Sequence, residues 1–298
     1  MKWEGNRESD NVEDRRDDGD SGGGGGGFGF GGGRSIGLGT IAVALVASYF
    51  FGISPTTVLS LLSGGPVSQP QSQQAPRPNR NGPAEDRQTK FVRTVLGDTE
   101  DVWTQIFRAN GKTYPAPTLV LFSNATQTAC GTGQTASGPF YCPGDRKVYI
   151  DLSFYQLMQK RFHVSGEFAQ AYVIAHEVGH HVQNLMGIMD KVNNAERRMS
   201  KAQANAMSVR LELQADCLAG VWAFHANQAR SILEQGDVEG ALNAATAIGD
   251  DALQKQAQGY VVPDSFTHGT SAQRVRWFKQ GVSTGEVKSC NTFEVKTL

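Results

Sequence analysis

The spacing of apolar residues changes along the chain from short continuous runs to a helical pattern. Apolar runs between turn-forming residues predict strands at 118–122, 138–141 and 147–151. From Phe154 almost to the end of the chain, apolar positions recur three and four residues apart, as on one face of a helix. A small sheet followed by many helices is typical of an α+β domain that is mostly helical.

Residues 91–107 also carry apolar side chains at helical spacing, on both sides of a glycine. Glycine weakens the interior of a helix, so we expect two short helices that are interrupted at Gly97. Together with the elements that follow, they predict one folded domain over residues 88–298, which is an ordinary size for a domain.

The first 87 residues differ in composition from this domain. Residues 1–20 hold eight acidic and four basic side chains with almost nothing apolar, and ten of the twelve residues at 22–33 are glycine. Such segments bury too little apolar surface to offset the entropy lost on ordering, so we expect a disordered tail at 1–35. Five prolines among polar residues between 66 and 83 predict an extended linker over 55–87.

Residues 36–54 form an uncharged apolar stretch that is just long enough to cross a bilayer as a helix. A cleaved signal peptide would have a shorter apolar stretch behind a basic segment, and a buried core helix would need folded neighbours. A single transmembrane helix is therefore the favoured interpretation. Five basic residues precede the stretch, whereas only Arg77 and Arg80 follow it closely, which places the tail in the cytoplasm. We expect the folded domain after this stretch to be exported.

Four cysteines lie in the predicted domain, and none of them is spaced as C-x-x-C, which argues against a structural cysteine–zinc site. An exported compartment favours disulfide formation. Of the three possible connectivities we favour Cys130 with Cys142, because it closes a short glycine-rich loop, and then Cys217 with Cys290. Four buried free thiols are the alternative.

The chain has 28 basic and 29 acidic side chains, a formal net charge of −1, and no basic tract. Proteins that bind nucleic acids carry an excess of Lys and Arg that neutralises phosphates, so a nucleic acid is not an expected partner.

The helical pattern between residues 165 and 187 contains the sequence H-E-V-G-H at positions 176–180. Two histidines four residues apart lie on one face of a helix, so His176 and His180 can bind one metal ion. Glu177 is one step further round the helix, where it can hold a water on the metal rather than bind the metal. The pattern is typical of H-E-x-x-H zinc hydrolases. An amphipathic helix that merely carries two histidines is the alternative interpretation.

A catalytic zinc usually has a third protein ligand, and Glu212 is the best candidate. It lies four residues before Asp216 in a second, largely apolar helical stretch, so both carboxylates face the same side. Buried carboxylates need partners, which a metal and its histidines supply. We expect Glu212 to be a ligand and Asp216 to accept the free ring N–H of a ligating histidine. A solvated pair of carboxylates is the alternative.

The motifs H-E-V-G-H-H and, about thirty residues later, E-L-Q-A-D resemble those of the gluzincin zinc metallopeptidases. With the acidic start, the glycine-rich tether and the sequence F-T-H-G-T-S-A-Q-R-V-R-W-F at 266–278, the whole chain resembles the bacterial neutral zinc metallopeptidase family (YpfJ-like). The resemblance implies a peptidase that is tethered to the bacterial inner membrane with its folded domain in the periplasm. It also implies that the peptidase binds Zn2+ through His176, His180 and Glu212 and uses Glu177 in catalysis. It implies a protein or peptide substrate without identifying one.

In this interpretation Glu177 is the general base that takes a proton from a zinc-bound water, which then attacks a peptide carbonyl. His268, in a predicted loop, is a candidate to hydrogen-bond the oxyanion, as distal histidines do in related metallopeptidases; stabilisation of its own loop is equally compatible with its position. His181 points about a third of a turn away from His180 and is expected to pack rather than to bind the metal.

Three functions compete. An endopeptidase is the first, and a non-enzymatic binding or regulatory module on a metallopeptidase fold is the second. The third is a zinc amidase that acts on cell-wall material. Inactive descendants of enzymes usually lose the general base, so the presence of Glu177 favours an enzyme.

Overall fold

The structure is a computed structural model that describes residues 1–17, 86–135, 138–162, 164 and 166–298. A four-stranded sheet has the order β1-β2-β6-β5, in which β1, β2 and β6 are parallel and β5 is antiparallel to β6. A separate hairpin joins β3 and β4. The strands are β1 (Val12–Asp14), β2 (Thr118–Phe122), β3 (Ala125–Thr128), β4 (Gly131–Gln134), β5 (Phe140–Cys142) and β6 (Lys147–Asp151).

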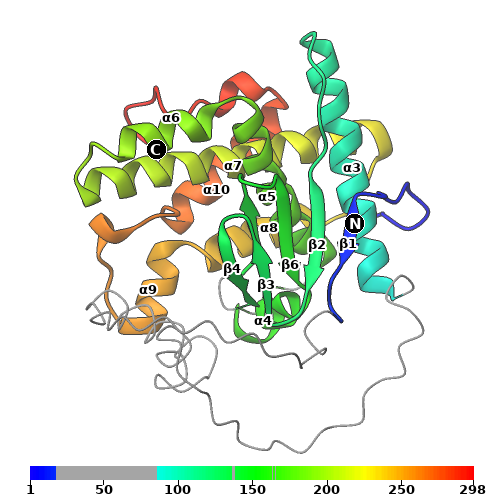
Figure 1. Ribbon diagram of the computed structural model, residues 1–298, viewed down its shortest axis with the longest axis horizontal. Coiled ribbons are helices and arrows are strands. Elements are labelled where there is room, and N and C mark those ends of the chain that lie inside the picture. Colours follow the sequence, from blue (N-terminus) through cyan, green and yellow to red (C-terminus); the bar gives the residue numbers. More distant parts are fainter. Residues whose placement is uncertain (18–85, 136–137, 163, 165) are drawn as a thin grey trace, which may run out of the picture. The chain divides into compact units, whose positions relative to one another are not determined.

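Helices make up most of the rest of the described chain and pack against the sheet (Figure 1). Helix α5 contacts β5 and β6, and it also packs against α3, α7 and α8. The helices are α3 (Arg87–Ala109), α4 (Ser153–Phe162), α5 (Glu167–Leu185), α6 (Ile188–Glu196), α7 (Lys201–Arg230), α8 (Asp237–Ala247), α9 (Asp250–Gln258) and α10 (Ser271–Thr284), with 3-10 turns η2 (Pro263–Ser265) and η3 (Val287–Cys290).

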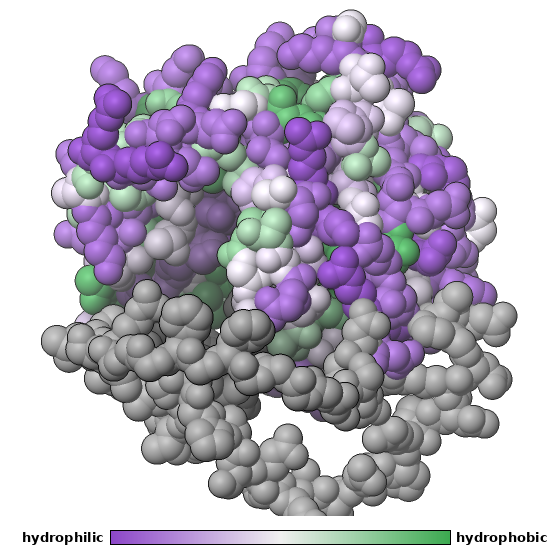
Figure 2. Space-filling model, in the orientation of Figure 1, coloured by the Kyte–Doolittle hydropathy of each residue, from purple (hydrophilic) through white to green (hydrophobic). Residues whose placement is uncertain are grey.

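Helix α5 lies at the centre of this arrangement. Apolar side chains cover almost its whole circumference, and nearly all residues from Phe168 to Gln183 are buried. A helix that is apolar all round must have neighbours on every side, which here are the sheet and the helices around it. The face of the described residues in Figure 2 is mostly hydrophilic, so the apolar residues are concentrated inside.

Glycines let α7 and α10 approach each other closely. A Cβ at Gly281 of α10 would lie 2.0 Å from the carbonyl oxygen of Cys217 on α7, and a Cβ at Gly220 would lie 2.3 Å from the carbonyl oxygen of Phe278. No side chain fits at these distances, so the α7–α10 contact requires glycine. The close packing brings the polar residues of these helices within hydrogen-bonding reach of one another.

The three strands predicted from the sequence are present, but the predicted interruption at Gly97 is wrong. Helix α3 is continuous and begins after Asp86, whose carboxylate accepts the backbone N–H of Thr89 at 2.8 Å. A Cβ at Gly97 would lie 2.8 Å from the carbonyl oxygen of Arg7. The glycine therefore allows the N-terminal segment to cross the helix, rather than ending it.

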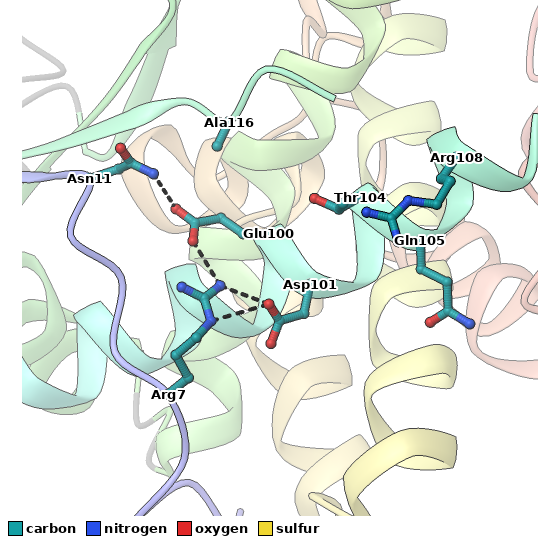
Figure 3. Close-up of a pocket in the computed structure, with 8 residues that line it drawn as sticks. All are labelled: Arg7, Asn11, Glu100, Asp101, Thr104, Gln105, Arg108 and Ala116. Carbon is teal, nitrogen blue, oxygen red and sulfur yellow. Dashed lines mark hydrogen bonds and ion pairs between the residues drawn. The ribbon is translucent and has the colours of Figure 1, made fainter. Parts of the chain in front are cut away.

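The first 17 residues correct the prediction of a disordered tail. Trp3 is 6% exposed, and β1 pairs with β2 through Val12 and Leu119. Buried Glu100 of α3 accepts hydrogen bonds from Arg7 at 2.8 Å and Asn11 at 2.7 Å (Figure 3). Backbone pairing and these charge-assisted bonds offset the entropy of ordering in a segment with few apolar residues.

The predicted membrane helix also requires correction. Among the residues that the structure describes, no helix is long and apolar enough to cross a membrane. The stretch 36–54 and nearly all of the linker predicted at 55–87 lie outside the described residues. The fold class is therefore corrected to mostly helical with small sheets and no described membrane helix. The predicted location in the inner membrane and periplasm, and the inner membrane as a partner, are withdrawn.

Candidate metal centre

Helix α5 presents His176 and His180 on the same face, one turn apart. Both are nearly buried, at 6% and 8% exposure, and their rings meet edge to face with centroids 4.8 Å apart. Gly179, between them, lies against α7, because a Cβ there would be 3.0 Å from the carbonyl oxygen of Ala215. The contact brings α7 alongside the two histidines.

Glu212 of α7 faces both imidazoles. Its Oε2 lies 3.2 Å from Nε2 of His176, and its Oε1 lies 3.4 Å from Nε2 of His180. One ligand atom from each of these three residues lies within 4.8 Å of the others. Two imidazole nitrogens and one carboxylate oxygen are the donors of a common type of catalytic zinc site, so the residues fit the metal that the sequence motif predicts.

The other ring nitrogen of each histidine already has a partner. Nδ1 of His176 is 2.8 Å from Oδ1 of Asp216, and Nδ1 of His180 is 2.9 Å from Oε1 of Gln183. With these oxygens as acceptors, both Nδ1 atoms carry the proton. When the rings are neutral, both Nε2 atoms therefore have free lone pairs, which is the tautomer that a metal requires.

Electrostatics in the cluster attract a cation. Burial lowers the pKa of His176, but the carboxylates of Asp216 and Glu212 outweigh it and raise the pKa to about 10. Burial also lowers the pKa of His180, and Glu212 raises it overall. Burial raises the pKa of Glu212, but the two histidines hold it well below its usual range. A metal ion would compete with protons for these atoms.

Asp216 is fully buried and is held from several sides. Arg274 of α10 donates to it twice, from Nε at 3.0 Å and from Nη2 at 2.9 Å, and the Tyr172 hydroxyl donates at 2.5 Å. The pair of Asp216 and Arg274 is nearly neutral, so the carboxylate can orient His176 without leaving an unpaired buried charge.

Glu177 lies beside the cluster but is not one of its members. It is 7% exposed and forms no hydrogen bond or ion pair with any other described residue. Its charge adds to burial in raising the pKa of Tyr155, whose hydroxyl is buried without a partner in the described part of the chain. No other described side chain therefore holds the carboxylate of Glu177 in place.

His268 lies in the loop before α10 and is held by Asp250 at the start of α9. Oδ2 of Asp250 accepts the backbone N–H groups of Thr267, His268 and Gly269, at 2.8, 2.6 and 3.0 Å. Oδ1 lies 3.4 Å from Nδ1 of His268. Burial lowers the pKa of His268, but Asp250 and Glu212 raise it overall. The role of Asp250 was not predicted from the sequence. The only feature that could have indicated it is the position of an acidic residue at the start of a helix.

His181 is kept away from the cluster. Its Nε2 lies 2.7 Å from the carbonyl oxygen of Pro115, and its Nδ1 lies 3.0 Å from the Tyr141 hydroxyl. Burial lowers its pKa to about 4. A residue in this position packs as a neutral imidazole.

The two disulfides have the predicted pairing, Cys130 with Cys142 and Cys217 with Cys290. Cys217 follows Asp216 directly on α7. The second disulfide therefore attaches the C-terminal segment to the helix that carries Glu212.

The sequence matches the family described as "Putative neutral zinc metallopeptidase" over residues 1–293. It is 54% identical to uncharacterized protein YpfJ of Escherichia coli (strain K12) over 293 residues, covering 98% of this chain and 99% of that protein. It is 43% identical to uncharacterized protein Rv2575 of Mycobacterium tuberculosis (strain H37Rv) over 196 residues, covering 62% of this chain and 65% of that protein. No solved structure matches the chain.

Proposed function

The chain belongs to the neutral zinc metallopeptidase family, and from that premise we propose that it is an endopeptidase with zinc held by His176, His180 and Glu212. One observation carries the proposal. The Nε2 atoms of both histidines face a single carboxylate, whose side chain is 15% exposed, while both Nδ1 atoms already have acceptors. A merely structural histidine pair has no need for this division between its ring nitrogens.

Zinc held there would supply a Lewis acid that polarises the scissile carbonyl and lowers the pKa of a water molecule. Glu177 would accept the proton of the attacking water and deliver it to the leaving nitrogen. Its lack of other partners among the described residues supports this role, since no bond must be broken before it acts.

His268 would stabilise the negative charge that develops on the carbonyl oxygen. Its side chain is 51% exposed, so it lies where a substrate can reach it, and Glu212 is near enough to affect its pKa. Asp250 orients the loop and favours the charged form of the imidazole, which is the better donor to an oxyanion.

The proposal is tested with the purified protein and a fluorescently labelled unfolded protein as substrate. We expect cleavage within the substrate chain, its loss after a chelator removes the metal, and its return when one equivalent of zinc is added. Equal cleavage by the chelated protein would exclude zinc catalysis. A protein that holds one zinc per chain but cleaves nothing would instead indicate a binding module.

A further inference from the structure

A cavity of about 870 Å³ lies apart from the metal cluster, between the end of α3, the end of α5, α6, α7 and the C-terminal segment. These elements can be followed in Figure 1. None of the three clustered residues lines it. On α5 it is lined by Val182 and Leu185, which lie on the opposite face of the helix from His176 and His180.

The wall of this cavity is mainly apolar. Its volume is in the range of sites that bind small molecules, which are likewise lined mostly by apolar and aromatic side chains. Large apolar side chains from five different elements contribute to it, including Trp103, Phe107, Leu185, Val192, Leu218 and Phe293.

The charged groups around the cavity are mainly cationic. Lys112 and Lys191 line it, are exposed, and form no ion pair with any described carboxylate. Lys288 also lines it but pairs with Glu286 at 3.3 Å, and Glu294 is the single acidic residue among the lining residues described. The local charge therefore favours an anion at the edge of an apolar space.

A buried donor in the wall also lacks an acceptor. Trp103 lines the cavity and is 1% exposed, and its indole N–H has no hydrogen-bond partner in the described part of the chain. Buried N–H groups of this kind are nearly always paired. The indole nitrogen itself is fully buried, so a ligand in the cavity would lie against the ring of Trp103 rather than accept its N–H.

We propose that the cavity binds a fatty acid, with its hydrocarbon tail among the apolar side chains and its carboxylate near Lys112 and Lys191. A buried peptide fits less well, because its backbone needs both donors and acceptors. The Gln214 side chain, a polar group in the wall, is already engaged. Its Nε2 donates to the carbonyl oxygen of Cys290 at 3.0 Å, and its Oε1 accepts from Gln183 at 3.1 Å. A hydrocarbon tail needs no such partners.

The test is calorimetric titration of the full chain with saturated fatty acids of 8, 10 and 12 carbons, each below its micellar concentration. We expect one site per chain and an affinity that rises about fourfold for each added methylene that is buried. A 12-bromododecanoate should quench tryptophan fluorescence in the wild type and do so much less in Trp103→Phe. Absence of saturable binding would overturn the proposal.

Two kinds of variant locate the site. Lys112→Gln combined with Lys191→Gln changes only exposed side chains and should weaken dodecanoate about tenfold without affecting dodecanol, whereas Lys255→Gln on α9 is the matched control. Ala195→Trp should fill the cavity and abolish binding of both ligands, with circular dichroism confirming the fold. The site would be contradicted if the lysine variant bound dodecanoate as tightly as the wild type does. It would also be contradicted if the wild type bound dodecyltrimethylammonium as tightly as dodecanoate. So would binding of an apolar peptide by a chain that does not bind dodecanoate.

Discussion

His180 and His181 are neighbours on helix α5, yet their surroundings shift their pKa values in opposite directions. The side of the helix that faces α7 holds His180 against Glu212, and this carboxylate raises its pKa in spite of burial. The side that carries His181 offers a hydroxyl and a carbonyl oxygen but no carboxylate, and burial lowers its pKa to about 4. Helix α5 thus has one side whose carboxylate favours a cation and another side whose partners are uncharged.

The comparison teaches that burial alone does not make a histidine into a metal ligand. Both rings are buried and both have two polar neighbours. What differs is that Nε2 of His180 faces a carboxylate shared with His176, whereas both nitrogens of His181 are satisfied by neutral groups.

The charged side is tested most strongly at Glu177. Glu177→Gln should lower the rate of peptide cleavage by about two to four orders of magnitude, because the amide cannot accept the proton of water. Zinc should remain at one ion per chain, since the clustered ligand atoms are unchanged. The exposed Glu239→Gln is the control and should cleave normally. Unchanged cleavage by Glu177→Gln would remove Glu177 from the mechanism.

The carboxylate that distinguishes the two sides is Glu212. Glu212→Ala should weaken zinc binding at least about 100-fold, because it removes one of three protein ligands. It should also lower the pKa of His180 toward that of a buried neutral imidazole. Competition with a fluorescent zinc chelator measures the affinity. A variant that retains the affinity of the wild type would show that the third ligand is another residue.

The ion pair of Asp216 and Arg274 is the next test of the charged side, because Asp216 is the partner of His176 Nδ1. Arg274→Met should lower the free energy of unfolding by about 3 to 5 kcal/mol, since it leaves a fully buried carboxylate without its cation. Asp216→Asn in the same chain should recover part of the loss, which urea unfolding of both single variants and the double variant measures. Additive losses would mean that the two side chains are not coupled.

The neutral side is tested by pH. The folded pKa of His181 lies below the ordinary value of 6.5, so the unfolded chain takes up the proton first as pH falls. Its contribution to stability is complete above pH 6.5 and is lost as pH falls toward 4, by up to about 3 kcal/mol. Urea unfolding of metal-free protein should show a steeper decline over this range in the wild type than in His181→Gln. Parallel curves for the two proteins would refute the assignment of His181 as a neutral imidazole.

The arrangement around α5 could be predicted from the sequence because it follows helical periodicity. Positions 176 and 180, like 212 and 216, are four residues apart, so each pair shares a face whatever the rest of the fold does. Whether the two pairs meet depends on the packing of α5 against α7. Gly179 permits this packing, but a glycine in the sequence does not predict it.

Contacts between distant segments could not be predicted in this way. Asp250 reaches the backbone of the loop at 267–269, and no period links these positions. The N-terminal segment is ordered by distant partners, the edge of β2 more than one hundred residues later and the side chain of Glu100. The polar composition predicted disorder because its partner strand could not be identified from the sequence.

X-ray absorption at the zinc edge of the zinc-loaded protein tests the central claim most directly. The account predicts two imidazole ligands with the remaining donors all oxygen, because His176 and His180 are the two described histidines whose Nε2 atoms face Glu212 and all four cysteines are in disulfides. A sulfur ligand, or a first shell without imidazole, would contradict the assignment of His176, His180 and Glu212 as the zinc site.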